Sequence, residues 1–305
     1  MIPDYQTLMR PVLECSGSGE ARIGEVVEQV AEKIGLTVEE RSQLLPSGKQ
    51  TVLANRVAWA KTYLFKAGLV ESTGRGHFRI TDRGRAALAD ATAIINNAFL
   101  HQFKEFQDFK VRVNEPDPGI TAVTTSEMTE SSETPDEVLR RAHGAITGAL
   151  AAELLDRMRK GTPAFFEKLI VTLLIAMGYG GTSEEAGRAI GQSGDDGVDG
   201  VIDQDPLGVD QIYVQAKRYA EGNNVGAGAL RDFYGALSLK KAQKGIFVTT
   251  SAFSPSAIET ARGLGSRIVL IDGIQLSRLM IRYNVGCRDE DVLRLKKIDE
   301  DFFEV

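Results

Sequence analysis

The chain has 305 residues, of which 43% are hydrophobic and 26% are charged, and its formal net charge at pH 7 is −6. This length predicts about two domains that can each bury a core, and the composition excludes a low-complexity or disordered chain. The negative net charge argues against a protein that coats DNA without specificity.

The cysteines, the histidines and the apolar stretches bear on the cellular compartment and on zinc binding. The two cysteines, Cys15 and Cys287, fall in different predicted domains, so we expect no disulfide and a reducing, cytoplasmic environment. The three histidines are widely scattered and lack the spacing of zinc ligands. The sequence shows no signal-peptide pattern and no apolar stretch long enough to span a bilayer, so we expect no association with membranes.

Residues 1–92 are predicted to form a small helical domain that ends in a hairpin. Apolar residues at helical spacing indicate one helix at 23–34 and another at 52–66. Four residues of the second helix are expected to face the core: Val57, Ala60, Leu64 and Phe65. Two short strands follow, joined by a glycine-flanked loop at Arg75, and a short helix starts at Thr81. A helix followed by a hairpin with a basic tip is the layout of a winged helix, a variant of the helix-turn-helix.

The charge of this domain predicts contact with DNA. Residues 49–85 include eight basic and two acidic residues. We expect the 52–66 helix to enter the major groove and the Arg75 loop to contact phosphate or the minor groove. The candidate DNA-binding residues are Arg56, Lys61, Arg75 and Arg79. Arg56 is a candidate for base edges as well as for phosphate, whereas Trp59 is expected in the core. A winged helix that binds another protein is the alternative.

Residues 93–160 are predicted to connect this domain to the next one. Phenylalanines at helical spacing indicate a helix at 93–112, whose apolar face would be buried against a domain or a partner chain. Residues 113–137 include seven acidic and no basic residues, with few large apolar side chains, which is typical of a disordered linker. Another helix is predicted near 138–159.

Residues 161–287 are predicted to form an α/β domain, followed by an acidic C-terminal tail at 288–305. Short apolar runs predict four strands, near 197–203, 211–217, 245–250 and 267–271. Helices are predicted near 226–241, 255–264 and 273–284. Turn-forming residues at 205–208 lie between the first two strands, which predicts that these strands pair as a hairpin.

The predicted hairpin would place Asp199 beside Gln215 and Lys217. Residues two apart on a strand share a face, so Gln215 and Lys217 would lie together. A carboxylate, an amide oxygen and an ammonium on one face suit Mg²⁺-assisted cleavage of a phosphodiester. Asp199 would be the central metal ligand, with the Gln215 amide oxygen or the Ala216 carbonyl as another. Lys217 would orient or deprotonate water or stabilise charge on the phosphate. An ordinary solvated strand face is the alternative on these residues alone.

Glu167 is a further candidate, in the apolar helix that follows Pro163. It lies on the same side of this helix as Ile170 and Val171. A buried carboxylate is costly unless it is paired or bound to a metal. The alternative is a glutamate that reaches solvent near the first helical turn, where it suits the helix dipole.

Several segments resemble the Mrr family of restriction endonucleases, within the PD-(D/E)xK nuclease superfamily. They are residues 55–56, 58–60, 67–69, 75–76, 163–167, 177–180, 194–200, 213–218, 233–237 and 245–251. The resemblance implies a restriction-endonuclease-like core, which is a mixed sheet flanked by helices, together with an N-terminal winged helix. It also implies the catalytic set Asp199, Gln215 and Lys217, with Glu167 as the helical acid. Gln215 replaces the acid of the general motif, which favours a single metal ion.

The resemblance implies a metal-dependent endonuclease of the type IV class, which restricts methylated foreign DNA. The expected partners are double-stranded DNA and at least one second copy of the chain, because a double-strand cut needs two active sites. The expected cofactor is Mg²⁺, with Mn²⁺ as a substitute. Small side chains on the 52–66 helix, at Ala54, Ala58 and Ala60, could accept a methyl group. The alternatives are a repair or junction-resolving nuclease and a non-cleaving DNA-binding regulator.

Overall fold

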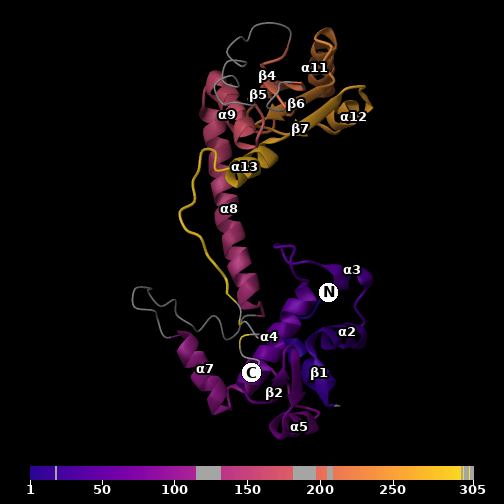
Figure 1. The fold of residues 1–305 in the computed structure, drawn as a ribbon, viewed down its shortest axis with the longest axis vertical. Coiled ribbons are helices and arrows are strands. Elements are labelled where there is room, and N and C mark those ends of the chain that lie inside the picture. The colour runs from indigo at the N-terminus through magenta and orange to yellow at the C-terminus, as the bar shows by residue number, and fades with distance from the viewer. Residues whose placement is uncertain are drawn as a thin grey trace. The chain divides into compact units, whose positions relative to one another are not determined.

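The computed structural model describes residues 1–17, 19–114, 132–180, 197–204, 209–296, 298 and 302. The chain divides into two compact units, one comprising Met1–His143 with Leu295–Val305 and the other comprising Gly144–Arg294. Figure 1 shows the elements of both units. Among the described residues, none of the helices combines the length and the apolar composition that crossing a bilayer would require.

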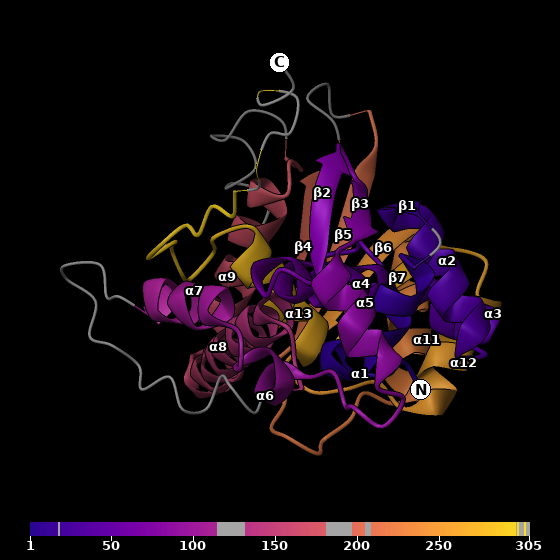
Figure 2. The same cartoon turned by 90° about the horizontal axis from the view of Figure 1, so that it is seen from below.

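The N-terminal unit has the winged-helix order of elements that the sequence predicts. Its elements are α1 (Tyr5–Cys15), β1 (Glu20–Arg22), α2 (Ile23–Lys33), α3 (Val38–Ser42), α4 (Val52–Lys66), β2 (Val70–Gly74), β3 (His77–Ile80), α5 (Asp82–Ala89), α6 (Asn97–Leu100) and α7 (Lys104–Asn114). The three strands form an antiparallel sheet in the order β1-β3-β2. Figure 2 shows β2 and β3 side by side, and Arg75 lies in the turn between them. Thr81 caps α5, because its hydroxyl accepts a hydrogen bond from the Gly84 amide at 3.1 Å.

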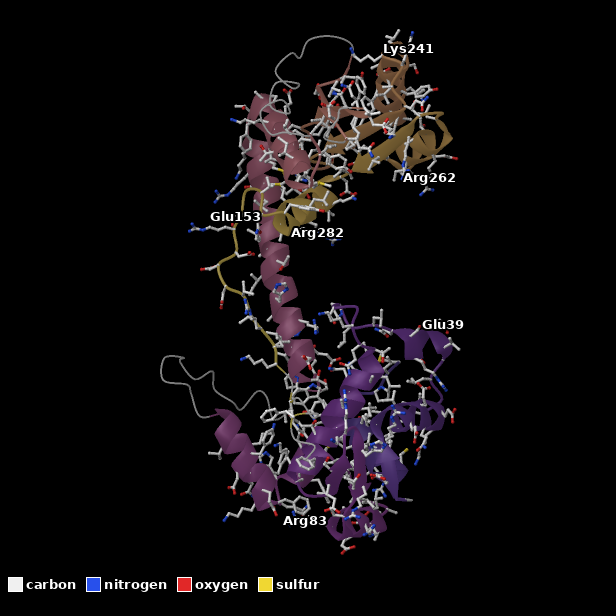
Figure 3. The ribbon with its side chains drawn as sticks, in the orientation of Figure 1. Glu39, Arg83, Glu153, Lys241, Arg262 and Arg282 are labelled. Carbon is white, nitrogen blue, oxygen red and sulfur yellow. The ribbon has the colours of Figure 1, made fainter. Side chains whose placement is uncertain are left out.

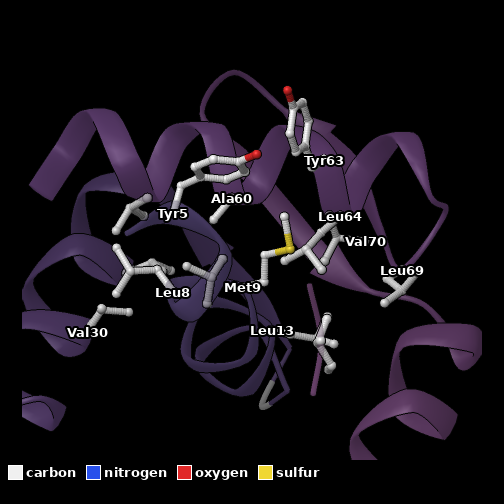
Figure 4. Packing of buried hydrophobic residues seen from close by; sticks show 14 of the residues in the cluster. Tyr5, Leu8, Met9, Leu13, Val30, Ala60, Tyr63, Leu64, Leu69 and Val70 are labelled. Carbon is white, nitrogen blue, oxygen red and sulfur yellow. The ribbon is translucent and has the colours of Figure 1, made fainter. Parts of the chain in front are cut away.

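The core of this unit lies between α1, α4 and the sheet (Figure 4). Of the residues predicted to face it from α4, the side chains of Val57, Ala60 and Leu64 are fully buried. The prediction for Phe65 is wrong: this residue is 41% exposed. Its ring lies near the ammonium groups of two flanking lysines instead.

The phenylalanines that follow residue 93 pack onto the same core, but the single helix predicted at 93–112 is wrong: two helices, α6 and α7, lie there. Phe106 of α7 is fully buried, and its ring centroid lies 5.8 Å from that of Tyr63 on α4. Phe109 lies 6.1 Å from Tyr63, and the Lys110 ammonium lies 4.7 Å from the Tyr63 ring centroid. Helix α7 therefore covers part of α4. Its apolar face is buried against a domain, which is one of the two predicted arrangements.

A long helix, α8 (Pro135–Lys160), contributes residues to both units. It starts three residues before the predicted helix near 138–159. The signal for its start is the spacing of Thr134 and Glu137. The Glu137 amide donates to the Thr134 hydroxyl at 3.2 Å, and the Thr134 amide donates to the Glu137 carboxylate at 2.8 Å. This reciprocal pair is a capping box. Of the predicted linker, residues 115–131 lie outside the described part of the chain.

The C-terminal unit is a mixed sheet flanked by helices, as predicted. Its elements beyond α8 are α9 (Pro163–Ala176), β4 (Gly200–Asp203), β5 (Gln211–Lys217), α11 (Ala227–Leu239), β6 (Lys244–Thr249), α12 (Pro255–Gly263), β7 (Arg267–Ile271) and α13 (Gly273–Arg282). The strand order is β4-β5-β6-β7. Strands β4 and β5 are antiparallel, which confirms the predicted hairpin, and β5, β6 and β7 are parallel. The turn residues 205–208 lie outside the described part.

Two apolar clusters cover the two faces of this sheet. One contains buried residues of α9 and α13 with Val214 of β5, and the other contains residues of α11 and α12 with Phe247 of β6. Helix α13 starts very close to the end of β6: a Cβ atom on Gly273 would lie 2.7 Å from the Thr250 carbonyl oxygen. Only glycine fits there without displacing the backbone.

Candidate active site

The β4–β5 hairpin brings Asp199 to Gln215 and Ala216. Asp199 directly precedes β4, and its amide donates at 2.9 Å to the carbonyl of Val214, the residue that pairs with Gly200. One carboxylate oxygen of Asp199 accepts two hydrogen bonds, from the Gln215 side-chain amide at 2.5 Å and from the Ala216 backbone amide at 2.7 Å. These bonds join Asp199 to residues 16 and 17 positions further along the chain, at one edge of the sheet.

The Asp199 carboxylate also faces α9. A small cavity is lined by Glu167, Ile170 and Val171 of α9 together with Asp199, Gly200, Val214 and Ala216. Glu167 thus lies on the same side of α9 as Ile170 and Val171, as the sequence predicts. Gln215 is only 2% exposed and lies on the opposite face of β5, and Lys217 is half-buried. Asp199 thus lines the cavity and also accepts the hydrogen bond from the Gln215 amide.

The electrostatics of the cavity raise the pKa of Glu167. Burial of the carboxyl is the largest cause, and the nearby Asp199 carboxylate acts in the same direction. The positive charge of Lys217 partly offsets both effects by lowering the pKa of Glu167. Two carboxylates and an ammonium therefore interact at this sheet edge, and two like charges lie close together.

The backbone at Lys217 is held by the neighbouring strand. The Lys217 carbonyl accepts from the Thr249 hydroxyl at 2.9 Å and from the Thr250 amide at 3.3 Å. The Thr250 hydroxyl in turn accepts from the Tyr219 amide and donates to the Tyr219 carbonyl, at 2.8 and 2.7 Å. These buried hydroxyls fix the end of β5 where Lys217 leaves the sheet. The cap of α12 is Ser254, whose hydroxyl accepts from the Ala257 amide.

The donor set at this edge fits a hard divalent cation. Mg²⁺ prefers oxygen ligands and needs only one or two carboxylates when water and substrate phosphate complete its coordination. Asp199 and Glu167 supply two carboxylates. The backbone amide of Ala216 points toward Asp199, and the amide and carbonyl of one strand residue point the same way, so the Ala216 carbonyl also faces this side. Within the described residues, no group of three or more histidine, cysteine and acidic side chains is placed to hold a metal ion.

The candidate DNA-binding residues occupy different positions in the N-terminal unit. Arg75 lies in the β2–β3 turn, where its carbonyl lies 2.8 Å from a ring nitrogen of His77. Arg79 is exposed on β3 and forms a 2.5 Å ion pair with Glu71 on β2. The Lys61 ammonium lies 5.7 Å from the centroid of the Phe78 ring. Arg75 and Arg79 therefore belong to the β2–β3 hairpin, and Lys61 lies beside it on α4.

Arg56 is held within the protein rather than extended into solvent. Its guanidinium forms an ion pair with Glu137 at 2.8 Å and donates to the carbonyls of Ile2 and Pro3 at 2.7 and 2.9 Å. Only 19% of the Arg56 side chain is exposed. In this conformation the guanidinium is directed at the start of α8.

The contact between the start of α8 and α4 is not foreseen in the sequence analysis. Asp136 accepts hydrogen bonds from the side chains of Asn55 and Trp59, at 3.1 and 2.9 Å. Trp59 packs partly against the core, as predicted, but its indole N–H faces α8. The capping-box spacing at residues 134–137 could have located the helix start, whereas nothing in the sequence identifies the surface that it covers.

Comparisons with known proteins agree with this architecture. The family model of the Mrr N-terminal domain matches residues 5–90, and a family model described as a restriction endonuclease, Mrr_cat, matches residues 158–280. The type IV methyl-directed restriction enzyme EcoKMrr of Escherichia coli (strain K12) is 34% identical to this chain over an alignment of 310 residues that covers 99% of each protein.

Two solved structures also show similarity. The DNA modification-dependent restriction endonuclease AspBHI gives a TM-score of 0.36 at 16% identity, over 70% of this chain and 53% of that one. MspJI restriction endonuclease in complex with a 27-mer oligonucleotide gives a TM-score of 0.35 at 17% identity, over 69% and 49%. The family assignment rests on the sequence matches, which extend over almost the full length: the chain belongs to the Mrr family of restriction endonucleases.

Proposed function

We propose that this protein is a metal-dependent endonuclease that cleaves methylated double-stranded DNA. The observation that carries the proposal is the convergence of Asp199, Glu167, Gln215 and Lys217 on one edge of the sheet. The similarity to EcoKMrr, a type IV methyl-directed restriction enzyme, supports methylated DNA as the substrate.

Asp199, Glu167 and the Ala216 carbonyl would hold a single Mg²⁺ ion, with Mn²⁺ as a substitute. The bound cation would activate water and neutralise charge on the scissile phosphate. The Gln215 amide donates to Asp199 here, and rotation of this amide by half a turn would direct its oxygen to the same place. Gln215 would thus support Asp199 in one orientation and serve as a neutral ligand in the other.

Lys217 would act on the phosphate and on the attacking water. Its ammonium is a compact positive charge with three donors, suited to a transition state whose charge is spread over phosphate oxygens. The two hydrogen bonds to the Lys217 carbonyl keep the strand end in place, so the side chain starts from a fixed position. Removing the ammonium would remove the positive charge that lowers the pKa of Glu167.

The N-terminal unit would bind the DNA through Arg75 and Arg79 of the wing and through α4, which carries Lys61. Contacts to phosphate would position the duplex, and contacts to base edges would select it. Cleavage of both strands would require two copies of the active site, so we propose a homodimer or a larger homo-oligomer as the cutting form.

The test compares cleavage of one plasmid, methylated and unmethylated, by the purified full-length protein with Mg²⁺. We expect faster cleavage of the methylated plasmid and no cleavage in the presence of a chelator. Equal cleavage of both plasmids would favour a repair nuclease. Binding without cleavage, with either Mg²⁺ or Mn²⁺, would favour a regulator and would contradict the proposed site.

A further inference from the structure

The outward face of α4 is covered by the first turn of α8. This contact, which we call the α4–α8 clasp, consists of Asn55, Arg56 and Trp59 of α4 with Thr134, Asp136 and Glu137. Thr134 is fully buried and Asn55 is 4% exposed, so the clasp excludes solvent from these two side chains. Both sides of the clasp belong to the N-terminal unit.

The groups in the clasp are those that a recognition helix presents to DNA. Arginine binds phosphate and carboxylate with the same planar fork of donors, and asparagine reads base edges through its amide. In the clasp, the Arg56 fork binds the Glu137 carboxylate at 2.8 and 2.9 Å. The Asn55 amide donates to Asp136 and accepts from the Thr134 hydroxyl, at 3.1 and 2.8 Å. Carboxylates of the same chain thus occupy the acceptor positions that DNA would fill.

We infer that the α4–α8 clasp and DNA compete for the same face of α4, so that the clasp is an autoinhibitory contact. The inference rests on the proposed function, in which α4 faces the DNA. Full engagement of α4 with DNA requires release of residues 134–137, and DNA that contacts only the wing leaves the clasp closed. DNA that offers a strong interaction to Arg56 and Asn55 is therefore selected over DNA that does not.

The clasp can open without unfolding the start of α8, because Glu137 caps this helix with one carboxylate oxygen and binds Arg56 with the other. One carboxylate oxygen accepts from the Thr134 amide and completes the capping box, and the other accepts from Arg56. The Thr134 hydroxyl accepts from the Glu137 amide within the same turn. These cap bonds persist when α4 is released, so only the bonds across the clasp are exchanged for bonds to DNA.

The decisive variant is Glu137→Gln in the full-length protein. Glutamine serves in a capping box as glutamate does, but it removes the charge that holds Arg56. We expect this variant to bind a methylated duplex about tenfold more tightly than the parent, measured by fluorescence anisotropy at fixed salt without divalent cation. The matched control is Glu153→Gln, which makes the same charge change on an exposed part of α8 (Figure 3) and is expected to leave binding unchanged.

Unchanged or weaker binding by Glu137→Gln would overturn the inference. An equal gain in both variants would also overturn it, because net charge alone would then explain the result. A second measurement needs no substitution: Trp59 is the single tryptophan, and its indole N–H is bound to Asp136. Saturating DNA should shift Trp59 emission in the parent protein. Constant emission while anisotropy reports complete binding would show that the clasp stays closed.

These readouts are independent of cleavage. If the plasmid test shows no cutting but Glu137→Gln still binds more tightly, the proposed nuclease activity fails and the clasp remains supported. If the parent cuts methylated plasmid and Glu137→Gln binds as the parent does, the clasp fails and the nuclease proposal stands.

Discussion

The arginine-paired acids of the N-terminal unit and Glu167 of the C-terminal unit have opposite surroundings. In the N-terminal unit, Glu137 lies 2.8 Å from Arg56 and Glu105 lies 3.1 Å from Arg83. The hydrogen bond from Arg83 lowers the pKa of Glu105. In the C-terminal unit, Glu167 faces another carboxylate, and its pKa is raised.

The two kinds of carboxylate differ in their counter-charge: the first kind is paired with an arginine of the same chain, and the second would be neutralised by a bound cation. A carboxylate with an arginine beside it has its counter-charge within the chain. A pair of carboxylates near one sheet edge retains a repulsion that a cation would relieve, and such pairs are typical of functional sites. Removing an acid should therefore cost a paired charge in the N-terminal unit and relieve a repulsion in the C-terminal unit.

The largest effect is expected at the sheet edge. Asp199→Asn and Lys217→Ala should each reduce the rate of plasmid cleavage by about a hundredfold or more, because each removes a group proposed to act on the cation or the phosphate. DNA affinity, measured by anisotropy, should be largely retained. Asp203→Asn is the matched control, since Asp203 lies on the same hairpin and accepts from Gln211 instead. Full cleavage by either site variant would disprove the assignment.

A core substitution in α4 should lower the stability of the N-terminal unit alone. Leu64→Ala removes a fully buried side chain from α4 and should lower the stability of the N-terminal unit by about 2–5 kcal/mol. Trp59 emission during urea unfolding reports on this unit, because the only tryptophan lies there. Leu239→Ala, at a position that is 76% exposed, is the control and should not change the Trp59 transition. An unchanged transition in Leu64→Ala would mean that this core does not hold the unit together.

The wing gives a smaller effect that depends on salt. Arg75→Ala should weaken binding of most DNA sequences alike and reduce the slope of log affinity against log salt by about 0.9, as expected for one lost phosphate contact. Arg157→Ala serves as a control because its side chain is 74% exposed on α8. Identical slopes for the parent and Arg75→Ala would leave the wing without a role in DNA binding.

The smallest effect is on stability at the active site. The folded-state pKa of Glu167 is raised, so ionisation of this carboxyl destabilises the fold as pH rises through the interval above the ordinary glutamate pKa. Glu167→Gln should therefore raise the melting temperature of metal-free protein at pH 7 by at most about 3 °C, and the gain should vanish in acid. A lower melting temperature at pH 7 would show that ionised Glu167 stabilises the fold.

Much of the C-terminal unit was predictable because its signals are local. Alternating apolar residues and a turn located β4 and β5, and the pairing of these strands brings Asp199 to Gln215. The alternation of a strand predicts that Gln215 and Lys217 share a face, but it does not predict that Gln215 is buried and hydrogen-bonded to Asp199, which also lines the cavity. Such a contact depends on rotamers, which sequence periodicity does not determine.

The N-terminal unit shows the limit of the same reasoning. Helix α4 and its buried residues follow from helical spacing, and the basic hairpin follows from composition. The contacts of Arg56 with Glu137 and of Trp59 with Asp136 join positions 81 and 77 residues apart. No periodic pattern links them, so an arginine on a predicted recognition helix looked exposed although it is mostly covered.

The close approach of α13 to β6 has a consequence for genetic variation. Any side chain at Gly273 would press on the Thr250 carbonyl, and the Thr250 amide and the Thr249 hydroxyl hold the Lys217 carbonyl. A population of random mutants selected for loss of restriction should therefore include substitutions at residue 273, although it lies 56 positions from Lys217 in the chain. In such a screen, a tightly packed glycine would be indistinguishable from a member of the active site.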